Sequence, residues 1–346
     1  MGESTHIGWT DHTANFWMGC QRVSPGCERC YAEVLVTGRM KLPVWGPPKT
    51  TERHRAKGVW KDVPKWNAAA QKAGVRRRMF VSSLSDIFED HPQVAPWRTE
   101  ALALLEKCTS LDVQLLTKRP ENIRDMVPPH WLREWPAHIW VGTTVEDQKR
   151  AEERIPELLM VPAAVRFLSC EPLLEAVRLD GILLDDGLVC PLEGRRWERL
   201  APPFAGSRAV PHPSISWVII GGESGSEARP FDIAWARSII SQCRNAGVPV
   251  FMKQTGARPV DSARAVVTQP CIVGGKPMLR DTIYAADAPE LAQARIDEKD
   301  AGLRLARPHV SHPLRVCTKD RAGADPSEWP RDMRVQEFPG VSNVTR

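Results

Sequence analysis

The chain has 346 residues, 42% of them apolar, which is enough for one large domain or two medium ones with a sizeable core. The 47 basic and 42 acidic residues leave a net charge of +5, which is compatible with an anionic partner but too small to indicate nucleic-acid binding by itself. The sequence has no basic and apolar leader and no apolar run of membrane-spanning length, so we expect a cytoplasmic protein without a membrane segment.

The predicted elements begin with a cysteine-rich loop, preceded by one candidate strand. From about residue 78, short apolar runs alternate with segments of helical periodicity. Six runs are nearly continuous in Val, Ile, Leu and Phe and end in polar residues, namely 78–83, 113–118, 139–144, 165–170, 216–222 and 249–254. Such runs are typical of strands that are buried on both faces of a parallel sheet. Helices are predicted over 97–110, 146–159 and 231–247.

The alternation of strand and helix predicts an α/β fold, a partial (β/α) barrel of about six parallel strands. A doubly wound open sheet is the alternative. We expect residues 1–256 to form the barrel and its N-terminal loop, with an insertion or β-ribbon at about 178–214. Residues 257–316 lack a clear period, and we expect 257–346 to be a C-terminal extension that packs on the barrel.

Nine cysteines in a cytoplasmic chain indicate metal or thiol chemistry rather than disulfides. Six are scattered, but Cys20, Cys27 and Cys30 lie within eleven residues, in a loop rich in Gly and Pro. A structural zinc site needs four ligands, and the nearest fourth candidate is His12. A [4Fe–4S] cluster on three cysteines leaves one iron open for a cofactor or substrate. The loop therefore favours a cluster, while zinc or unliganded thiols stay open as alternatives.

The run IGWTDHTANFWMGCQRVSPGCERCYAE resembles the opening of the phage Gp37/Gp68-like family (DUF5131), a three-cysteine family related to radical S-adenosylmethionine (SAM) enzymes. FVSSLSDIFED, LLTKRPENI, VRFLSCEPLL, WVIIGGESGSEARP, GVPVFMKQTG and DPSEWPRDMRVQEFP continue the resemblance. It implies a radical SAM-like barrel, a [4Fe–4S] cluster and SAM as cofactors, and an electron donor such as flavodoxin or ferredoxin. One electron from the cluster would cleave SAM to a 5′-deoxyadenosyl radical, which takes hydrogen from the substrate.

The cysteine spacing, C-x6-C-x2-C, departs from the C-x3-C-x2-C usual for radical SAM enzymes, and Arg29 stands where an aromatic residue usually precedes the last cysteine. SAM chemistry is therefore an implication of the resemblance and not of the loop itself.

Polar residues directly after buried strands converge at one mouth of a barrel. We expect cofactor contacts from these strand ends, in particular from Ser82, Ser83, Asp86, Lys118, Glu146, Gly221, Gly222 and Glu223. The segment 82–86 is the predicted site for the amino group of SAM, and Gly221 and Gly222 would allow close backbone approach. The alternative for the acidic residues is helix capping. Arg119, beside Lys118, is either an anion partner or a surface cation in a turn.

Three residues at the strand ends are candidate catalytic groups: Cys170, Glu171 and Lys253. At a strand end the thiol of Cys170 could donate a hydrogen atom to a substrate radical, whereas free cysteines are more often inert buried residues. Lys253 is a candidate partner for a carboxylate or phosphate.

The sequence thus favours a radical SAM-type enzyme of unknown reaction. A nucleobase or nucleotide in phage-related DNA modification is one candidate substrate, which the basic run 76–78 favours weakly. The alternative is a non-catalytic, zinc- or cluster-stabilised nucleic-acid-binding protein. A metal-independent hydrolase that uses the strand-end carboxylates would leave the three-cysteine loop without a purpose.

Overall fold

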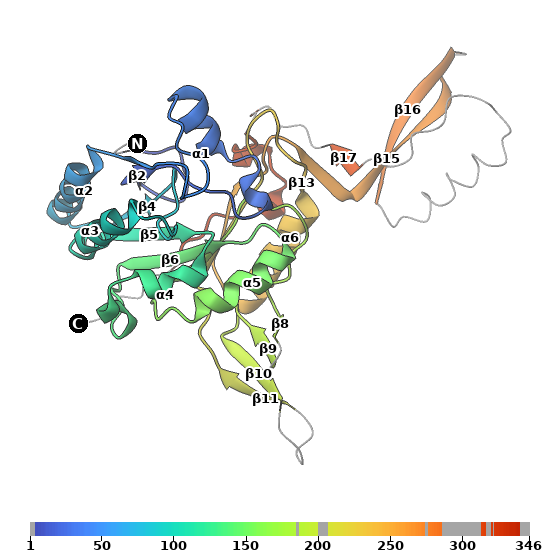
Figure 1. Ribbon diagram of the computed structural model, residues 1–346. Helices are drawn as coiled ribbons and strands as arrows, with labels where there is room; N and C mark the ends of the chain where they lie inside the picture. Colours follow the sequence, from blue (N-terminus) through green and yellow to red (C-terminus); the bar gives the residue numbers. More distant parts are fainter. Residues whose placement is uncertain are drawn as a thin grey trace.

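The computed structural model describes residues 4–184, 187–199, 207–273, 276–285, 313–315, 320 and 322–339. Its centre is a seven-stranded, all-parallel sheet in the order β1-β4-β5-β6-β7-β12-β14, which curls into a half-barrel (Figure 1). The strands are β1 (His12–Ala14), β4 (Arg77–Val81), β5 (Leu111–Thr117), β6 (Ile139–Thr144), β7 (Arg166–Cys170), β12 (Trp217–Gly221) and β14 (Val250–Gln254). All six predicted runs form strands of this sheet, and β1 is the additional strand before the cysteines. The predicted α/β half-barrel is confirmed.

Helices cover the outer, convex face of the sheet (Figure 1). They are α2 (Val59–Ala73), α3 (Val94–Glu106), α4 (Ile123–Met126), α5 (Gln148–Leu159) and α6 (Ile233–Ala246), with α1 (Tyr31–Glu33) in the cysteine region. Three match predicted helices, whereas α2 was not predicted. A π-helical segment spans Val34–Arg39, and short 3₁₀ turns lie at Pro25–Cys27, Pro120–Asn122, Pro129–Leu132, Pro326–Glu328 and Arg331–Met333.

The helix boundaries follow from capping side chains. Helix α5 begins after Asp147, whose carboxylate accepts a hydrogen bond from the Arg150 amide at 2.7 Å. Helix α6 begins after Asp232, which caps the Ala234 amide in the same way, and ends at Gly247 in the left-handed conformation. Glu146 therefore does not cap a helix.

The two faces of the sheet belong to different hydrophobic clusters. The outer face joins the helices in the main core, which contains Leu168 and Cys170 of β7. The inner, concave face carries an aromatic cluster made of Trp9, Phe80, Trp140, Phe167, Trp217, Ile219 and Phe251. Trp217 lies between Trp9 and Trp140, with both ring centroids 6.2 Å away in edge-to-face geometry. This cluster fills the inside of the half-barrel below the carboxyl ends of the strands.

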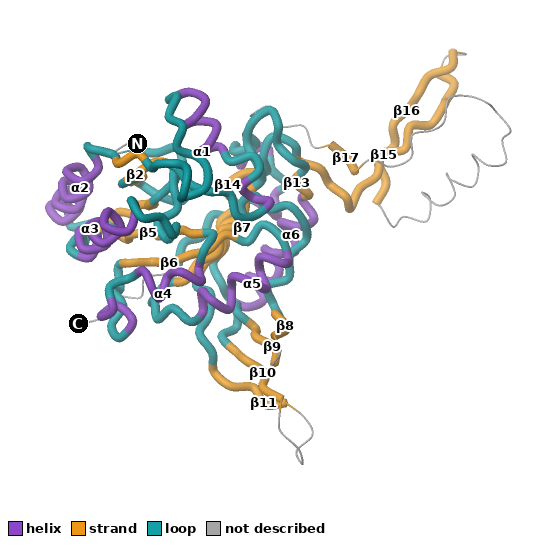
Figure 2. The backbone as a smooth tube through the Cα atoms, in the orientation of Figure 1, coloured by secondary structure: helices purple, strands orange, loops and turns teal. Residues whose placement is uncertain are grey.

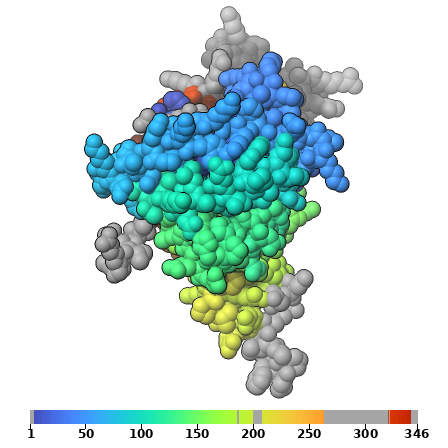
Figure 3. All heavy atoms as spheres, turned by 60° about the vertical axis from the view of Figure 1, so that its left-hand side comes forward, coloured from blue at the N-terminus to red at the C-terminus, as the bar shows by residue number. Residues whose placement is uncertain are grey.

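A small antiparallel sheet is inserted between β7 and β12, where residues 178–214 predict an insertion or ribbon. It contains β8 (Ile182–Leu184), β9 (Gly187–Cys190), β10 (Arg195–Arg199) and β11 (Ser207–Pro211), in the order β11-β10-β9-β8. It extends away from the barrel at the bottom of Figures 1 and 3. A second antiparallel pair joins β2 (Trp17–Met18) to β3 (His54–Arg55) beside the cysteine loop.

The C-terminal region has two described parts. The hairpin of β15 (Pro259–Val273) and β16 (Lys276–Ala285), with β17 (Pro313–Arg315) and β13 (Phe231–Asp232) at its base, projects from the body (Figure 2). Residues 322–339 instead lie on the barrel, where Trp329, Met333 and Val335 are buried in the main core. The rest of the predicted extension is outside the described residues, and the division at residue 256 stays a prediction. Within the described part of the chain, no helix combines the length and apolarity needed to cross a membrane.

Candidate functional site

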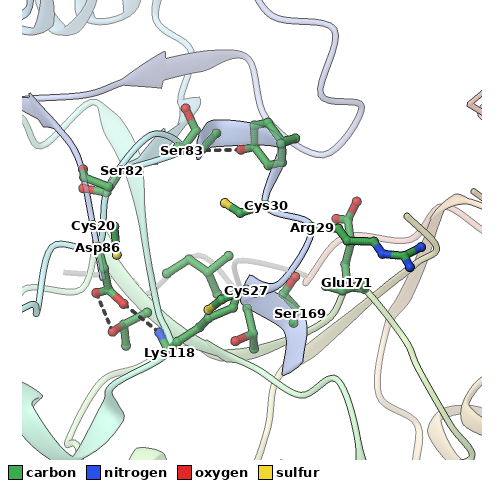
Figure 4. Close-up of a pocket in the computed structure, with 18 of the residues that line it drawn as sticks. Cys20, Cys27, Arg29, Cys30, Ser82, Ser83, Asp86, Lys118, Ser169 and Glu171 are labelled. Atoms are coloured by element: carbon green, nitrogen blue, oxygen red, sulfur yellow. Dashed lines mark hydrogen bonds between the residues drawn. The ribbon is translucent and has the colours of Figure 1, made fainter. Parts of the chain in front are cut away.

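A cavity of about 290 Å³ opens at the carboxyl ends of the parallel strands (Figure 4). Its lining includes all three clustered cysteines and most of the polar residues predicted at the strand ends. Ser82, Ser83, Asp86, Lys118, Glu171, Gly222, Glu223 and Lys253 line it, whereas Glu146, Cys170 and Gly221 do not. Ile7, Trp9, Phe80 and Leu116 form its apolar floor.

The cysteine loop is shaped by short local contacts. Gly19 has a φ of +109°, and a Cβ there would lie 2.3 Å from the carbonyl oxygen of Val44, so the position requires glycine. Cys27 ends the 3₁₀ turn that begins at Pro25, and Cys30 is the residue before helix α1. Figure 4 shows the three sulfur atoms turned toward the same hollow. Cys27 is buried, while Cys20 and Cys30 are half-buried.

The thiols are arranged around a space rather than around one point. No group of three or more His, Cys, Asp or Glu side chains within the described ranges is close enough to hold a single metal ion. A tetrahedral zinc ion with Zn–S bonds of about 2.3 Å needs its sulfurs roughly 3.8 Å apart. Burial raises the pKa of both the Cys20 and the Cys30 thiol, so these two groups stay protonated unless a metal centre takes the proton's place.

Arg229 fixes the far side of the cysteine loop. Its Nη2 donates to the carbonyl oxygen of Pro25 at 3.0 Å, and its Nη1 lies 3.3 Å from the carboxylate of Glu28. The same guanidinium pairs with Glu223, which also accepts from the Arg229 amide at 2.8 Å. Glu223, predicted as a cofactor contact, therefore binds the arginine that holds the loop.

Asp86 is occupied by the protein itself. Its carboxylate accepts from Thr117 Oγ1 at 2.7 Å, the Lys118 amide at 3.0 Å, the Phe88 amide at 3.0 Å and Arg119 Nη1 at 2.8 Å. Burial by itself raises the pKa of Asp86, but the Arg119 guanidinium and the other hydrogen bonds outweigh it and hold the pKa below its usual range. Asp86 thus orients Arg119 instead of presenting a free carboxylate to a cofactor.

Arg119 is the main residue that the sequence-based prediction left undecided. It is only 7% exposed, which rules out the surface-cation alternative. Its Nη1 lies 3.7 Å from the sulfur of Cys20, and its Nη2 donates to the carbonyl oxygen of Gln21 at 2.8 Å. Neighbouring Lys118 is half-buried at the cavity wall, and no carboxylate among the described residues comes within ion-pair distance of its ammonium group.

Glu146 lies beneath the cysteine loop. Its Oε2 accepts from Arg154 Nη1 at 2.7 Å, and its Oε1 is buried without a hydrogen-bond partner in the described structure. A Cβ added to Gly26 would lie 3.0 Å from this oxygen. Burial by itself raises the pKa of Glu146, but Lys118 and Arg154 outweigh it and hold the pKa below its usual range. Glu146 is thus a buried anion that supports the loop from below and does not line the cavity.

Glu171 and Lys253 form an ion pair at the opposite wall of the cavity. Gln254 Nε2 donates to Glu171 at 3.2 Å and to the carbonyl oxygen of Gly222 at 2.7 Å. The pair is only partly buried, with side-chain exposures of 21% for Lys253 and 18% for Glu171. Both charged side chains are therefore partly exposed at the cavity, and the catalytic role of these two residues stays a prediction.

The serines after β4 lie at the cavity wall. Ser82 is buried with a φ of +70°, and its hydroxyl has no hydrogen-bond partner among the described residues. Ser83 accepts from Asn15 Nδ2 at 2.8 Å, and its carbonyl oxygen accepts from the Tyr31 hydroxyl at 2.8 Å. The Ser82 hydroxyl is thus buried and unpartnered, whereas the hydroxyl and the carbonyl of Ser83 are both bound within the chain.

Cys170 lies in the main core, fully buried, and not in the cavity. Side chains alternate along a strand, so Ser169 and Glu171 reach the cavity while Cys170 points to the helices. The structure therefore offers no path for hydrogen transfer from this thiol to a bound substrate.

The two glycines after β12 lie against other parts of the protein. A Cβ at Gly222 would lie 2.5 Å from the carbonyl oxygen of Thr255, and a Cβ at Gly221 would meet the side chain of Glu171.

Sequence reasoning missed two residues that hold the site, namely Arg229 and Tyr31, and it gave Gln254 no role beyond its place at a strand end. Each acts through a partner far away in the chain, as in the hydrogen bond between Tyr31 and Ser83. Gln254 alone had a local signal, because it directly follows Lys253 at the end of β14.

Comparison with known proteins gives one match. Neither the curated proteins nor the solved structures contain a significant relative of this chain. A family model described as a protein of unknown function, DUF5131, matches residues 4–311, which include the whole cysteine loop and all seven strands of the half-barrel. The chain therefore belongs to the DUF5131 family.

Proposed function

We propose that this protein is an iron–sulfur enzyme of the radical SAM type, as the resemblance to the phage Gp37/Gp68-like family implies. The observation that carries the proposal is the convergence of Cys20, Cys27 and Cys30 on one cavity at the carboxyl ends of a parallel half-barrel. That is the position at which α/β folds bind ligands. The rest of the cavity contributes charged and polar groups, and its floor is apolar.

The donor set fits a cluster better than a single zinc ion. Three thiols line the cavity, and the described residues offer no compact set of ligands for one ion. A cubane cluster spreads its protein sulfurs more widely than one tetrahedral ion does, because each thiolate binds a different iron. Cys20, Cys27 and Cys30 would hold three irons, and the fourth would face the cavity.

The cavity walls could hold SAM and a substrate. When bound, the cluster and SAM would supply one electron and a 5′-deoxyadenosyl radical that takes a hydrogen atom from the substrate. The Glu171 carboxylate can accept hydrogen bonds from an amino group. Lys118 and Lys253 can bind a carboxylate or phosphate. The aromatic rings of Trp9 and Phe80 would help to keep water from the reacting atoms.

A nucleobase or nucleotide remains the candidate substrate, and flavodoxin or ferredoxin the candidate electron donor. The basic run 76–78 does not strengthen this choice, because it begins β4 and the cavity lies at the other end of the strand. Its charges are also paired: Arg76 Nε donates to Asp112 at 2.9 Å, and Arg78 Nε lies 3.4 Å from Asp11. Support for an aromatic substrate comes instead from the rings that line the cavity.

Anaerobic purification of the full chain, followed by iron and sulfide analysis and an absorption spectrum, tests the proposal. We expect about four irons and four sulfides per chain in the wild type. Cys20→Ala, Cys27→Ala and Cys30→Ala should each lose most of the iron, whereas Cys190→Ala, in the inserted sheet, should keep it. Adding SAM and dithionite should then release 5′-deoxyadenosine.

A colourless protein with one zinc per chain would support the alternative, a metal-stabilised nucleic-acid-binding protein. The absence of both iron and 5′-deoxyadenosine, with the three thiols intact, would refute the radical SAM proposal. Iron retained equally by all four variants would show that the cluster is bound elsewhere.

A further inference from the structure

We propose that Arg119 sets the reduction potential of the cluster by donating an N–H to the sulfur of Cys20. This inference rests on the proposed function, because it assumes that Cys20 is a cluster ligand. It assigns to a residue outside the cysteine loop a role in tuning the metal centre rather than in binding substrate. Hydrogen bonds to the sulfurs of an iron–sulfur cluster are among the main factors that set its potential.

The Arg119 guanidinium contacts the sulfur of Cys20 and the backbone of the following residue. Arg119 Nη1 lies 3.7 Å from Cys20 Sγ, within hydrogen-bond range for sulfur. Arg119 Nη2 donates to the carbonyl oxygen of the next residue, Gln21, at 2.8 Å. The two contacts fix the guanidinium relative to the sulfur, so the N–H cannot turn away from it without breaking a second bond.

A buried carboxylate network anchors the guanidinium from the other side. Asp86 pairs with Arg119 at 2.8 Å, and Glu89 lies 3.9 Å from its Nη2. The two carboxylate oxygens of Glu89 accept hydrogen bonds from Nε and Nη2 of Arg53, both at 2.8 Å. Three of the five N–H groups of Arg119 therefore donate to Cys20, Asp86 and Gln21. Most of the hydrogen-bonding capacity of Arg119 is thus used within the protein, although the residue lines the cavity.

The other two cysteines have no arginine that donates to their sulfur. The Ser24 hydroxyl lies 3.8 Å from the sulfur of Cys27, and Cys30 has backbone hydrogen bonds with Ala32 and Glu33 and the charge of Lys118 in its surroundings. Among the described residues, a hydrogen bond from a guanidinium thus reaches one of the three sulfurs, that of Cys20. A positive charge that donates to a thiolate stabilises the reduced cluster, which carries one more negative charge, so it raises the reduction potential.

The test is a redox titration followed by electron paramagnetic resonance on the reconstituted full chain, without SAM. Arg119→Met should move the midpoint potential to a more negative value than in the wild type. Arg119→Lys keeps the charge but loses the planar fork, so its midpoint should fall between the two. Lys118→Met is the matched control, because it removes an adjacent cavity-lining cation whose charge acts on Cys30 but which, unlike Arg119, has no hydrogen bond to a sulfur among the described contacts. Its midpoint should shift less than that of Arg119→Met.

An unchanged midpoint in Arg119→Met, or an equal shift in Lys118→Met, would overturn the inference while the proposed function stands. If Arg119→Met does not assemble a cluster, Arg119→Lys decides: a wild-type midpoint overturns the inference, and a more negative one supports it. A wild-type chain that assembles no cluster overturns both. Because the readout is a potential, a residue that only stabilises the fold would not produce the expected order of the variants.

Discussion

The buried ion pair beneath the cysteine loop gives a quantitative test of the structure. Glu146 is 0% exposed and Arg154 is 7% exposed in their side chains, with 2.7 Å between Oε2 and Nη1. Glu146→Leu leaves the guanidinium with two acceptors, the carbonyl and hydroxyl oxygens of Thr144 at 3.0 and 3.1 Å. Removing one partner of a buried pair costs about 3–5 kcal/mol. Because Arg154 keeps two hydrogen bonds, we expect the lower end of this range.

A double variant distinguishes the interaction energy between Glu146 and Arg154 from the penalty of leaving one of the two charges buried and unpaired. Arg154→Met should also destabilise the fold, because it leaves the carboxylate of Glu146 buried with Oε1 already unpartnered. Combining the two substitutions removes both charges, so the loss should be smaller than the sum of the single losses by about 0.5–3 kcal/mol. Urea unfolding followed by circular dichroism measures all four chains. Strictly additive losses, or single losses below about 1 kcal/mol, would refute the buried pair.

Two further predictions concern other positions. His138 is buried near the carbonyl oxygen of Leu105, and burial lowers its pKa from 6.5, so the unfolded chain binds a proton that the folded chain does not. The free energy of unfolding should therefore fall as the pH drops below 6.5 toward the lower native pKa. Urea midpoints measured across this range should depend less on pH in His138→Gln than in the wild type. A wild-type stability that rises as the pH falls would contradict this prediction. Gly222→Ala should cost about 1–3 kcal/mol in thermal unfolding because its Cβ meets Thr255. Gly38→Ala, with open space around it in a helical segment, should not destabilise the fold. Equal melting temperatures for these two variants would argue against the packing at Gly222.

The sheet could be predicted because its strands are buried on both faces. The strands β4, β6, β7, β12 and β14 each pack an aromatic side chain inside the half-barrel and aliphatic or sulfur-containing ones against the helices, as Phe167 and Leu168 do in β7. Such a strand is apolar at nearly every position, which makes it visible as a continuous run. The sequence pattern of helix α2 did not predict a helix, because Pro64 lies inside it and its outer positions carry several polar residues.

The strand ends were predicted as a set, but the direction of each side chain was not. In the run VRFLSC the cavity face is fixed by a period of two, which places Ser169 inward and Cys170 outward. The sequence contains this alternation, and Phe167 belongs to the same inner face as Ser169. Choosing the inner face requires knowing which side of the sheet is concave, and that depends on the curl of the whole sheet.

The role of Arg119 could not be derived from its neighbours in the chain. Its contact with Cys20 spans 99 residues, and its contact with Gln21 spans 98. A cation followed by proline is also common in exposed turns. Arg119 is buried because the cysteine loop packs against the end of β5, and this contact is visible only in the folded chain.

The segment 335–337 has a consequence for how the protein behaves in solution. It runs antiparallel to β14, the last strand of the sheet, with the Met252 amide donating to Val335 at 2.8 Å and the Glu337 amide donating to Val250 at 3.0 Å. The outer backbone groups of this strand are thereby paired within the chain, and a second molecule cannot add a strand there. A shortened chain lacking 322–339 would expose the unpaired backbone and apolar side chains of β14. We expect such a chain to self-associate before it loses the cavity.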